Sequence, residues 1–222
     1  MDSEFSVKLA HPFYEDHALY HAYRLRQGIQ TVRAWAFNGW MKEGDSWRTG
    51  CYIHAGLSGS GPISIKGPGA KRYVQSIVMN SLERFPVGTM KHAVMCSEDG
   101  LIAAHGIIER QAEDHFESFA GGPPGHHVQP SDIPPDVELE RLGHYLFQVA
   151  GPTALQVLEK VTGESLRDIK FLRFRNTRIN GVRTEIGRIG MTGGLAYELH
   201  GPLEEGPAIY DAVFKAGQDL GI

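Results

Sequence analysis

Three histidines stand in stretches whose residue pattern predicts strands or strand ends: His54, His92 and His105. Imidazole titrates nearer to neutral pH than other side chains, so it is a common carrier of protons in catalysis. If the turn that follows His92 pairs Ser97 with Gly100, His92 lies directly opposite His105 across a hairpin, where the two rings could share a proton or bind a ligand. The alternative is that these histidines face solvent or bond to the backbone.

A metal site at these histidines would need a third group, and His54 is the candidate. No His-x-His or His-x-x-x-His spacing supports such a site, and no cysteine cluster of the zinc type accompanies it. We therefore expect no metal. The chain also lacks a Gly-rich phosphate loop and a Ser-His-Asp order. Proton transfer and ligand binding are the chemistries that these residues favour.

A pattern of strand, Gly-Pro corner and helix occurs three times and would position these side chains. The corners are Gly67-Pro68, Gly151-Pro152 and Gly201-Pro202. Alternating residues precede each corner, and apolar residues at three- and four-residue intervals follow it. Proline suits a first helical turn. Helices that are apolar on one side must cover one face of a sheet.

Two hairpins separate these helices. One turns around Ser97-Glu98-Asp99-Gly100, and the other turns at Asn180-Gly181, where both turn positions need positive φ. The order strand, helix, hairpin occurs twice, which predicts an α+β fold of two ferredoxin-like lobes, each an antiparallel sheet with helices mostly on one side. A crevice between two lobes is a common ligand site, so we expect one there.

The predicted organisation has three parts. Residues 1–50 form an aromatic-rich N-terminal segment, part of which has helical spacing. Residues 51–128 form the first α+β lobe and residues 129–222 the second. Between the lobes, the stretch GGPPGHHVQPSDIPPDVE is rich in proline and glycine and is typical of a connector.

Composition describes an ordinary globular chain of 222 residues with 41% hydrophobic and 22% charged residues. A net charge of −4 and a pI near 6.3 give no reason to expect a nucleic acid or an anionic membrane as a partner. Two cysteines suit a reducing compartment. We see no signal peptide and no run of 18 apolar residues, so we expect a cytoplasmic protein.

Two longer stretches resemble the aminomethyltransferase superfamily, which includes the T-protein of the glycine cleavage system. The first is IKGPGAKRYVQSIVMNSLERFPVGTMKHAVMCSEDGLIAAHGIIER, with a GxxA helix start, an asparagine after the helix and a PVG turn. The second is GMTGGLAYELHGP, similar to the family's second folate-contacting stretch. MKHAVMCSEDGLIAAHGIIER and the Trp-rich NGWMKEGDSWRTG look nearest to tetrahydrofolate-dependent aromatic O-demethylases of the syringate or vanillate type. The family's C-terminal barrel would be expected after the last residues.

The resemblance implies tetrahydrofolate as cofactor and assigns roles to residues. Glu198 corresponds to the carboxylate that grips the pterin ring, and a carboxylate can accept two parallel hydrogen bonds from an aminopyrimidine edge. Tyr197, on the other face of the same strand, and Asn80 are further cofactor-binding candidates, although Asn80 could equally be a turn former. Without the resemblance, Glu198 would be read as a solvated strand carboxylate.

His105 departs from the family pattern, because T-proteins have an aspartate there. His54 also replaces an aspartate, and His92 stands where the family often has an aromatic residue. We therefore expect a tetrahydrofolate-dependent O-demethylase with His105, His54 and His92 as catalytic candidates, in which His105 with His54 or a tyrosine from the first fifty residues handles the ether oxygen of a methoxyarene. An aminomethyl-type transferase and a folate-binding module without catalysis are the alternatives. The sequence does not indicate an oligomeric state.

Overall fold

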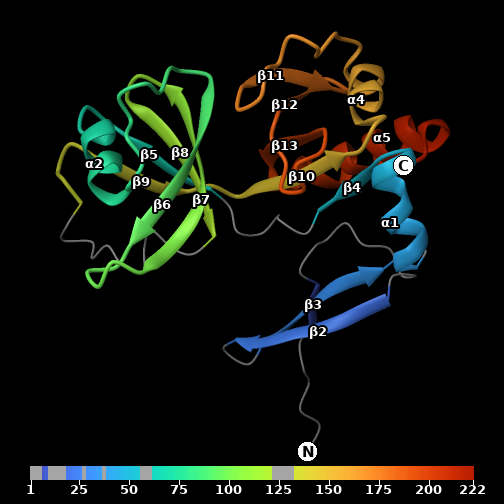
Figure 1. Cartoon of the computed structure of the whole chain (residues 1–222), viewed down its shortest axis with the longest axis horizontal. Helices are drawn as coiled ribbons and strands as arrows, with labels where there is room; N and C mark the ends of the chain where they lie inside the picture. The colour runs from blue at the N-terminus through green and yellow to red at the C-terminus, as the bar shows by residue number, and fades with distance from the viewer. Residues whose placement is uncertain (1–6, 10–18, 27–28, 37–38, 56–61, 122–132) are drawn as a thin grey trace, which may run out of the picture. The chain divides into compact units, whose positions relative to one another are not determined.

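The computed structural model describes residues 7–9, 19–26, 29–36, 39–55, 62–121 and 133–222 (Figure 1). The chain divides into two compact units. Unit 1 comprises residues 1–59, 145–168 and 176–222, and unit 2 comprises residues 60–144 and 169–175. Each unit is built around one five-stranded sheet.

The N-terminal region forms strands where part of it was predicted to be helical. β2 (Leu19–Arg26) pairs antiparallel with β3 (Ile29–Ala36), and β1 (Val7–Leu9) pairs parallel with β3. The helical prediction was wrong because these segments are rich in aromatic and β-branched residues, which favour strands once a partner strand supplies the hydrogen bonds. A helix, α1 (Trp40–Thr49), follows and buries none of its side chains.

Unit 2 holds the sheet β6-β7-β8-β5-β9. Its strands are β5 (Ile63–Lys66), β6 (Thr89–Cys96), β7 (Ile102–Ala112), β8 (His115–Gly121) and β9 (Glu138–Arg141). The helix α2 (Ala70–Ile77) packs on one face, where Tyr73 and Val74 join a core with Ile65, Ile108 and Phe116. The side chains that α2 buries, Ala70, Tyr73 and Val74, are thus three and four residues apart, as the sequence pattern predicted for a helix that is apolar on one side.

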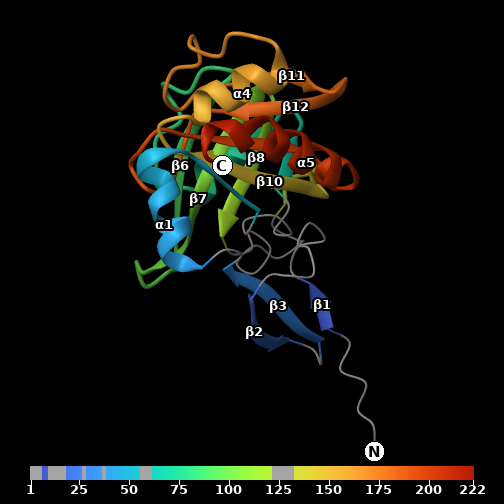
Figure 2. The ribbon, with the colours of Figure 1, turned by 90° about the vertical axis from the view of Figure 1, so that its right-hand side faces the viewer.

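Unit 1 repeats the same plan in the sheet β11-β12-β13-β10-β4. Its strands are β4 (Tyr52–His54), β10 (His144–Ala150), β11 (Phe174–Ile179), β12 (Val182–Gly187) and β13 (Ala196–Pro202). The helices α4 (Ala154–Thr162) and α5 (Gly206–Gly217) lie next to each other (Figures 1 and 2). In both sheets the strand that precedes a Gly-Pro corner and a helix, β5 in unit 2 and β10 in unit 1, lies between a short edge strand and the last strand of a three-stranded meander. The predicted α+β fold with two ferredoxin-like lobes is confirmed.

Pairing of two short strands crosses the predicted lobe boundaries. β4 lies in the predicted first lobe but pairs with β10 of unit 1, and β9 lies in the predicted second lobe but pairs with β5 of unit 2. The boundaries at residues 50 and 128 stay predictions. The predicted connector lies mostly outside the described residues.

Two of the three corner glycines are required by close backbone approach. Gly67 and Gly151 have φ values of 114° and 126°, which glycine adopts readily. A Cβ on Gly151 would stand 2.5 Å from the carbonyl oxygen of Gly50, and one on Gly67 would collide with the carbonyl of Asp136. Gly50 and Asp136 each lie just before the edge strand of their sheet. In both sheets, therefore, the glycine at the corner lets the backbone approach the segment that leads into the edge strand.

The two predicted hairpins form. Asn180 and Gly181 have φ values of 51° and 81°, as a two-residue turn of this type needs. In the other hairpin, β6 and β7 pair through a five-residue loop, with Cys96 opposite Ile102, and a bulge shifts the register beyond Met95. The register considered above, with Ser97 and Gly100 as the first rung of the ladder, is therefore not the observed one. These two residues are joined within the turn, where the N–H of Gly100 donates to the carbonyl of Ser97 at 3.0 Å.

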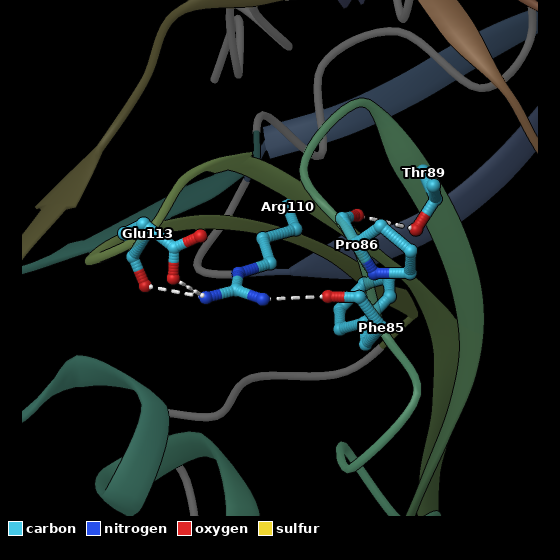
Figure 3. Close-up of polar contacts among 5 residues, drawn as sticks. All are labelled: Phe85, Pro86, Thr89, Arg110 and Glu113. Carbon is cyan, nitrogen blue, oxygen red and sulfur yellow. Dashed lines mark hydrogen bonds and ion pairs between the residues drawn. The ribbon is translucent and has the colours of Figure 1, made fainter.

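A buried arginine fixes the PVG turn before β6 (Figure 3). Arg110 is 7% exposed and donates to the carbonyl of Phe85 at 2.7 Å and to that of Glu113 at 3.0 Å. It also pairs with the Glu113 carboxylate, and the Thr89 hydroxyl donates to the carbonyl of Pro86 at 2.7 Å. A guanidinium can serve several acceptors at once, so one side chain satisfies carbonyls that the turn leaves without strand partners.

Among the described residues, no helix is long and apolar enough to cross a membrane.

Candidate functional site

In unit 2, His92 and His105 form a stacked pair on the exposed side of the β6–β7 hairpin. Their ring centroids are 5.4 Å apart at an interplanar angle of 11°, and Nδ1 of His92 lies 3.3 Å from Nε2 of His105. His92 and His105 do not lie directly opposite each other, as a register with Ser97 paired to Gly100 would have placed them. Instead, His105 pairs with Val94, and His92 pairs with Ile107. They are diagonal neighbours on one face, a spacing that long and aromatic side chains can bridge.

Asn80 holds the segment after α2 to the edge of the same hairpin. Its Oδ1 accepts the backbone N–H of Val94 at 2.9 Å, and the backbone N–H of Met79 donates to the carbonyl of Val94 at 2.8 Å. Gln75 donates to the Asn80 carbonyl at 3.2 Å. One oxygen of Asn80 is thus committed to local structure, beside the strand that carries His92; its role towards a cofactor stays a prediction.

In unit 1, the helices define which side of the sheet each residue faces. Phe147 of β10 meets Tyr210 of α5 edge to face, with centroids 5.7 Å apart. The hydroxyl of Tyr197 on β13 is close enough to Glu159 of α4 for the charges to interact. Because successive strand residues alternate in direction, Gln148 and Glu198 point to the face opposite α4 and α5. This face of the unit 1 sheet is called the helix-free face below.

The helix-free face carries a buried chain of two carboxylates and an imidazole. His200 and Glu198 lie two residues apart on β13, and Glu185 on β12 pairs directly with His200. Nδ1 of His200 lies 3.6 Å from Oε1 of Glu185, and its Nε2 lies 3.6 Å from Oε2 of Glu198. His200 is 4% exposed, Glu185 is 9% exposed and Glu198 is 7% exposed. These separations are ion-pair distances that exceed hydrogen-bond length, and the attraction is present when the imidazole is protonated.

The cross-strand neighbour of Glu198 is Gly187, which has no side chain. The position on β12 directly opposite Glu198 therefore supplies no side-chain hydrogen-bond donor that could compete with a ligand for the carboxylate. In the part of the chain that the structure describes, the Glu198 carboxylate makes an ion-pair contact with His200, at the distance given above. A carboxylate with an oxygen left for further donors suits a ligand edge that carries N–H groups.

His54 shares the helix-free face with Glu198. It pairs with Gln148 across the β4–β10 ladder, and directly paired residues point to the same side. Its neighbour Tyr52 donates to Oε1 of Gln148 at 3.1 Å. His54 is exposed at the edge of the sheet. Two residues predicted independently, one catalytic and one cofactor-binding, thus lie on the same surface of one sheet.

Tyr197 faces the helices, on the other side of β13 from Glu198. It is 1% exposed, and burial raises the pKa of its hydroxyl, while the nearby Arg188 opposes that shift. The sequence placed Tyr197 and Glu198 on opposite sides of the strand, as their adjacent positions in β13 require, and both side chains are buried. A role for Tyr197 in holding a cofactor remains a prediction.

Sequence reasoning missed His200, Glu185 and Gln148. A signal for the first was present, because Glu-x-His on a strand puts both side chains on one face. The other two could be found only with the register of the sheet, since their partners lie on different strands. The tyrosines predicted to approach the ether oxygen from residues 1–50 lie where the structure describes no side chains.

The chain thus presents an α+β scaffold with a buried acid–base surface in one sheet and a histidine pair in the other. The sequence profile of the GCVT N-terminal domain matches residues 11–222, and the chain belongs to that family. This is the family of the glycine cleavage aminomethyltransferases, whose cofactor is tetrahydrofolate.

Individual relatives agree with the family assignment. A sesamin methylene transferase from Sinomonas sp. (strain No.22) is 37% identical over 174 residues, which cover 77% of this chain and 38% of that protein. An aminomethyltransferase from Geobacillus sp. (strain WCH70) is 28% identical over 215 residues, 89% of this chain and 57% of the relative. The chain therefore spans between about two fifths and three fifths of the length of these relatives.

Among solved structures, the glycine cleavage system aminomethyltransferase T from Bartonella henselae superposes with a TM-score of 0.73 at 18% identity. The superposition covers 89% of this chain and 54% of the other. At this identity the match concerns the fold, and it agrees with the two repeated sheets described above.

Proposed function

We propose that the chain is a tetrahydrofolate-dependent O-demethylase, which moves a methyl group from a methoxylated aromatic compound to N5 of tetrahydrofolate. The observation that carries the proposal is the buried Glu198 carboxylate, braced by His200 on the helix-free face of the unit 1 sheet. Bound folate supplies a nucleophilic nitrogen for the methyl group. The chain's residues bind and orient the folate and would deliver a proton to the ether oxygen, while the proton of N5 is released as the methyl group takes its place.

Glu198 is the residue assigned to the pterin ring. The 2-amino group and the neighbouring ring N–H of a reduced pterin form a donor pair that a carboxylate can accept in parallel. In a buried setting such a pair is stronger than in water, and its geometry fixes the orientation of the ring. Gly187 opposite Glu198 leaves that edge open to the ligand.

The histidines are assigned to the ether oxygen. When the methyl–oxygen bond breaks, its electron pair stays on the oxygen, so a proton donated at that atom converts a poor phenolate leaving group into a phenol. His105, stacked on His92, is the proposed donor, and His54 is a second candidate on the face that carries Glu198. The N-terminal aromatic residues are assigned to the arene.

The sesamin methylene transferase supports an aromatic donor, because its name gives sesamin, an aryl ether, as the source of a one-carbon group. The two cysteines, both free thiols in the structure, are compatible with the cytoplasm that we assign to the protein. We expect no nucleic-acid partner.

A second candidate is an aminomethyl-type one-carbon transferase. Its support is the alignment with aminomethyltransferases over 89% of the chain. The histidine in place of the family's aspartate at position 105 favours the first candidate, because it alters the proton chemistry. A folate-binding module without turnover is the third possibility, and it makes the same binding prediction as the other two.

Calorimetric titration with tetrahydrofolate tests the binding step on the wild-type chain and on Glu198→Gln. We expect the substitution to weaken binding at least 100-fold, in line with the loss of a buried charge-assisted pair. The exposed Glu204 lies six residues further along, and Glu204→Gln serves as the matched control that should bind normally. Wild-type chain that does not bind tetrahydrofolate contradicts the proposal.

Product analysis then separates the candidates. Incubation with vanillate or syringate and tetrahydrofolate should give 5-methyltetrahydrofolate and the corresponding phenol. Incubation with an aminomethyl donor that yields methylenetetrahydrofolate instead would establish the second candidate. Binding without turnover of either donor class would establish the third and sink the O-demethylase assignment.

A further inference from the structure

His92 and His105 hold two imidazole nitrogens at a separation that suits the ligands of one metal ion. Nδ1 of His92 lies 3.3 Å from Nε2 of His105, and the two rings are 11° from parallel. Two nitrogens that bind one zinc ion at about 2.0–2.1 Å in tetrahedral geometry stand about 3.3 Å apart. The side chains are therefore spaced for bidentate binding before any ion arrives.

The register of the β6–β7 hairpin creates this pair, which is why spacing along the chain gave no reason to expect a metal. His92 and His105 are 13 positions apart in the sequence. They become neighbours because Val94 pairs with His105 and Ile107 pairs with His92. Asn80 supports the ladder at this point, since its Oδ1 accepts the N–H of Val94 at 2.9 Å. Ligands held on paired strands lose little further freedom when they bind an ion, which favours chelation.

Both rings can present a lone pair to an ion. A neutral imidazole has one N–H and one lone pair, so the ion requires the proton of His92 on Nε2 and that of His105 on Nδ1. Both residues are exposed, and the χ2 torsion of histidine is broad, so a small rotation of each ring directs its lone pair towards one point. An excess proton held between the rings is released to solvent when the ion binds.

Water completes the coordination of such an ion. Among the described residues, no third His, Cys, Asp or Glu completes a ligand cluster with this pair. Lys91, next to His92 in the chain, directs its ammonium group to the carbonyl of Ser81 and over the ring of Phe85. Two imidazoles without a carboxylate favour copper, nickel and zinc over magnesium and calcium, which prefer oxygen ligands.

We propose that His92 and His105 form a bidentate site for an exchangeable divalent transition-metal ion, which binds Nδ1 of the first residue and Nε2 of the second. The ion is an inhibitor and not a cofactor. It takes the Nε2 lone pair of His105, so this ring can no longer become an imidazolium, the form that delivers a proton. Binding of the ion stands by itself, whereas its effect on methyl transfer rests on the proposed function.

Calorimetric titration with nickel chloride tests the site on the wild-type chain, His92→Gln and His105→Gln. Two ligands joined at a fixed distance bind about 100-fold or more tighter than one ligand alone. We expect each substitution by itself to weaken the tightest nickel site about 100-fold, because either change leaves a single imidazole. Electron paramagnetic resonance of the copper-loaded chain is the second readout, and it should show two nitrogen ligands in the wild type and one in each variant.

Controls are needed because the chain has 11 histidines and two cysteines. His54→Gln removes a histidine that is exposed at the edge of the other sheet. Cys96→Ser removes the free thiol at the end of β6, the strand that carries His92. The double change His126→Gln with His127→Gln removes two adjacent histidines of the sequence. All three control proteins should keep the tightest nickel site.

Single-turnover methyl transfer measures the effect of the ion on the reaction. Nickel should inhibit the wild type at the concentration at which it binds, and His92→Gln should need about 100-fold more nickel, since it keeps His105 but loses the chelate. A tight nickel site that either substitution leaves intact overturns the proposed site. Nickel that binds at the pair without slowing methyl transfer overturns the inhibition alone. If the metal-free chain transfers no methyl group, the proposed function is wrong, and the titrations alone decide the metal site.

Discussion

The two sheets share one strand order, and each buries two carboxylates, Glu185 and Glu198 in unit 1 and Glu109 and Glu117 in unit 2, but they differ in where they place the histidines described above. The sheet of unit 1 buries Glu185, Glu198 and His200 on the face that its helices leave open. The sheet of unit 2 exposes its histidine pair, His92 and His105, on the outside of a hairpin. Buried charges need fixed partners, whereas exposed imidazoles remain free to exchange protons with solvent.

The difference indicates a division of labour within a repeated scaffold. A buried, braced carboxylate is suited to hold a ligand in one orientation, because its own position cannot relax into water. An exposed imidazole is suited to proton transfer, because it can reload between turnovers. We therefore expect substitutions in the unit 1 sheet to act on affinity and substitutions in the histidine pair to act on turnover.

The largest expected effect is on turnover. His105→Gln should lower the rate of methyl transfer from a methoxyarene by about 100-fold or more, the usual value of a general acid. The dissociation constant for tetrahydrofolate should stay within about twofold of the wild type, since His105 is exposed and no folate contact is assigned to it. Single-turnover kinetics and calorimetry measure the two quantities. An equal loss of methyl-transfer rate and of tetrahydrofolate affinity would assign His105 to binding. The proposed division of labour between the two sheets would then be wrong.

The sequence predicted some elements of the fold and missed others. The Gly-Pro corners and the Asn180-Gly181 turn were predictable because each depends on a backbone conformation that few residues adopt. The N-terminal hairpin was not, because helical and alternating spacing overlap in short segments and strand pairing decided the outcome. The register that would have placed His92 opposite His105 is shifted by two residues: the loop closes on Leu101 instead of Gly100, and a bulge after Met95 adds the second residue, neither of which the sequence pattern locates.

For the site, single residues were easier to predict than their partnerships. Glu198 and His54 were named from motif positions, but their common sheet face follows from the pairing of β4 with β10. Glu185 meets His200 through the β12–β13 register, which depends on tertiary pairing. Sequence patterns report on neighbours along the chain, so contacts across strands stay hidden from them.

A second prediction concerns the stability of unit 2. Arg110→Met should lower the free energy of unfolding by about 2–4 kcal/mol, because the buried carbonyl of Phe85 loses its donor. Urea denaturation measures the loss, and hydrogen exchange should show it in β6 and β7. Glu113 is 83% exposed on its side chain, so Glu113→Gln should change stability by less than about 1 kcal/mol. If both variants lose stability equally, the ion pair matters more than the carbonyl contacts.

A third prediction uses pH to separate the two cores. Burial raises the pKa of Tyr145 to about 12, and its hydroxyl donates to Thr184 at 3.3 Å. In the unfolded chain the group ionises near pH 10, so its contribution is fully present below pH 10 and is lost as pH rises towards 12. The loss should approach about 2 kcal/mol.

Tyr145→Phe isolates this contribution. Urea denaturation of both proteins at pH 9 and at pH 11.5 should show a smaller pH-dependent loss in the variant, because the ionising group is gone. The corresponding first strand of unit 2, β5, has the apolar Ile65 fully buried. Equal slopes for wild type and variant would mean that Tyr145 ionises in the folded chain as easily as in the unfolded one.

The smallest expected effect tests the brace behind Glu198. His200→Gln keeps one N–H donor but cannot span both carboxylates, so Glu198 loses part of its fixed orientation. We expect the affinity for tetrahydrofolate to fall about tenfold, which corresponds to about 1.4 kcal/mol. Turnover at saturating folate should change little, because the substitution does not touch the proposed proton donors.

The matched control is a second histidine–glutamate pair in the other sheet. Nε2 of His115 on β8 lies 3.7 Å from Oε1 of Glu117 and 3.0 Å from Oγ of Ser64. His115→Gln makes the same chemical change in unit 2, at a residue to which no folate contact is assigned, so affinity should not move. A tenfold loss with both variants would show that folate affinity follows general stability. A loss with His200→Gln alone ties the affinity to the orientation of one carboxylate.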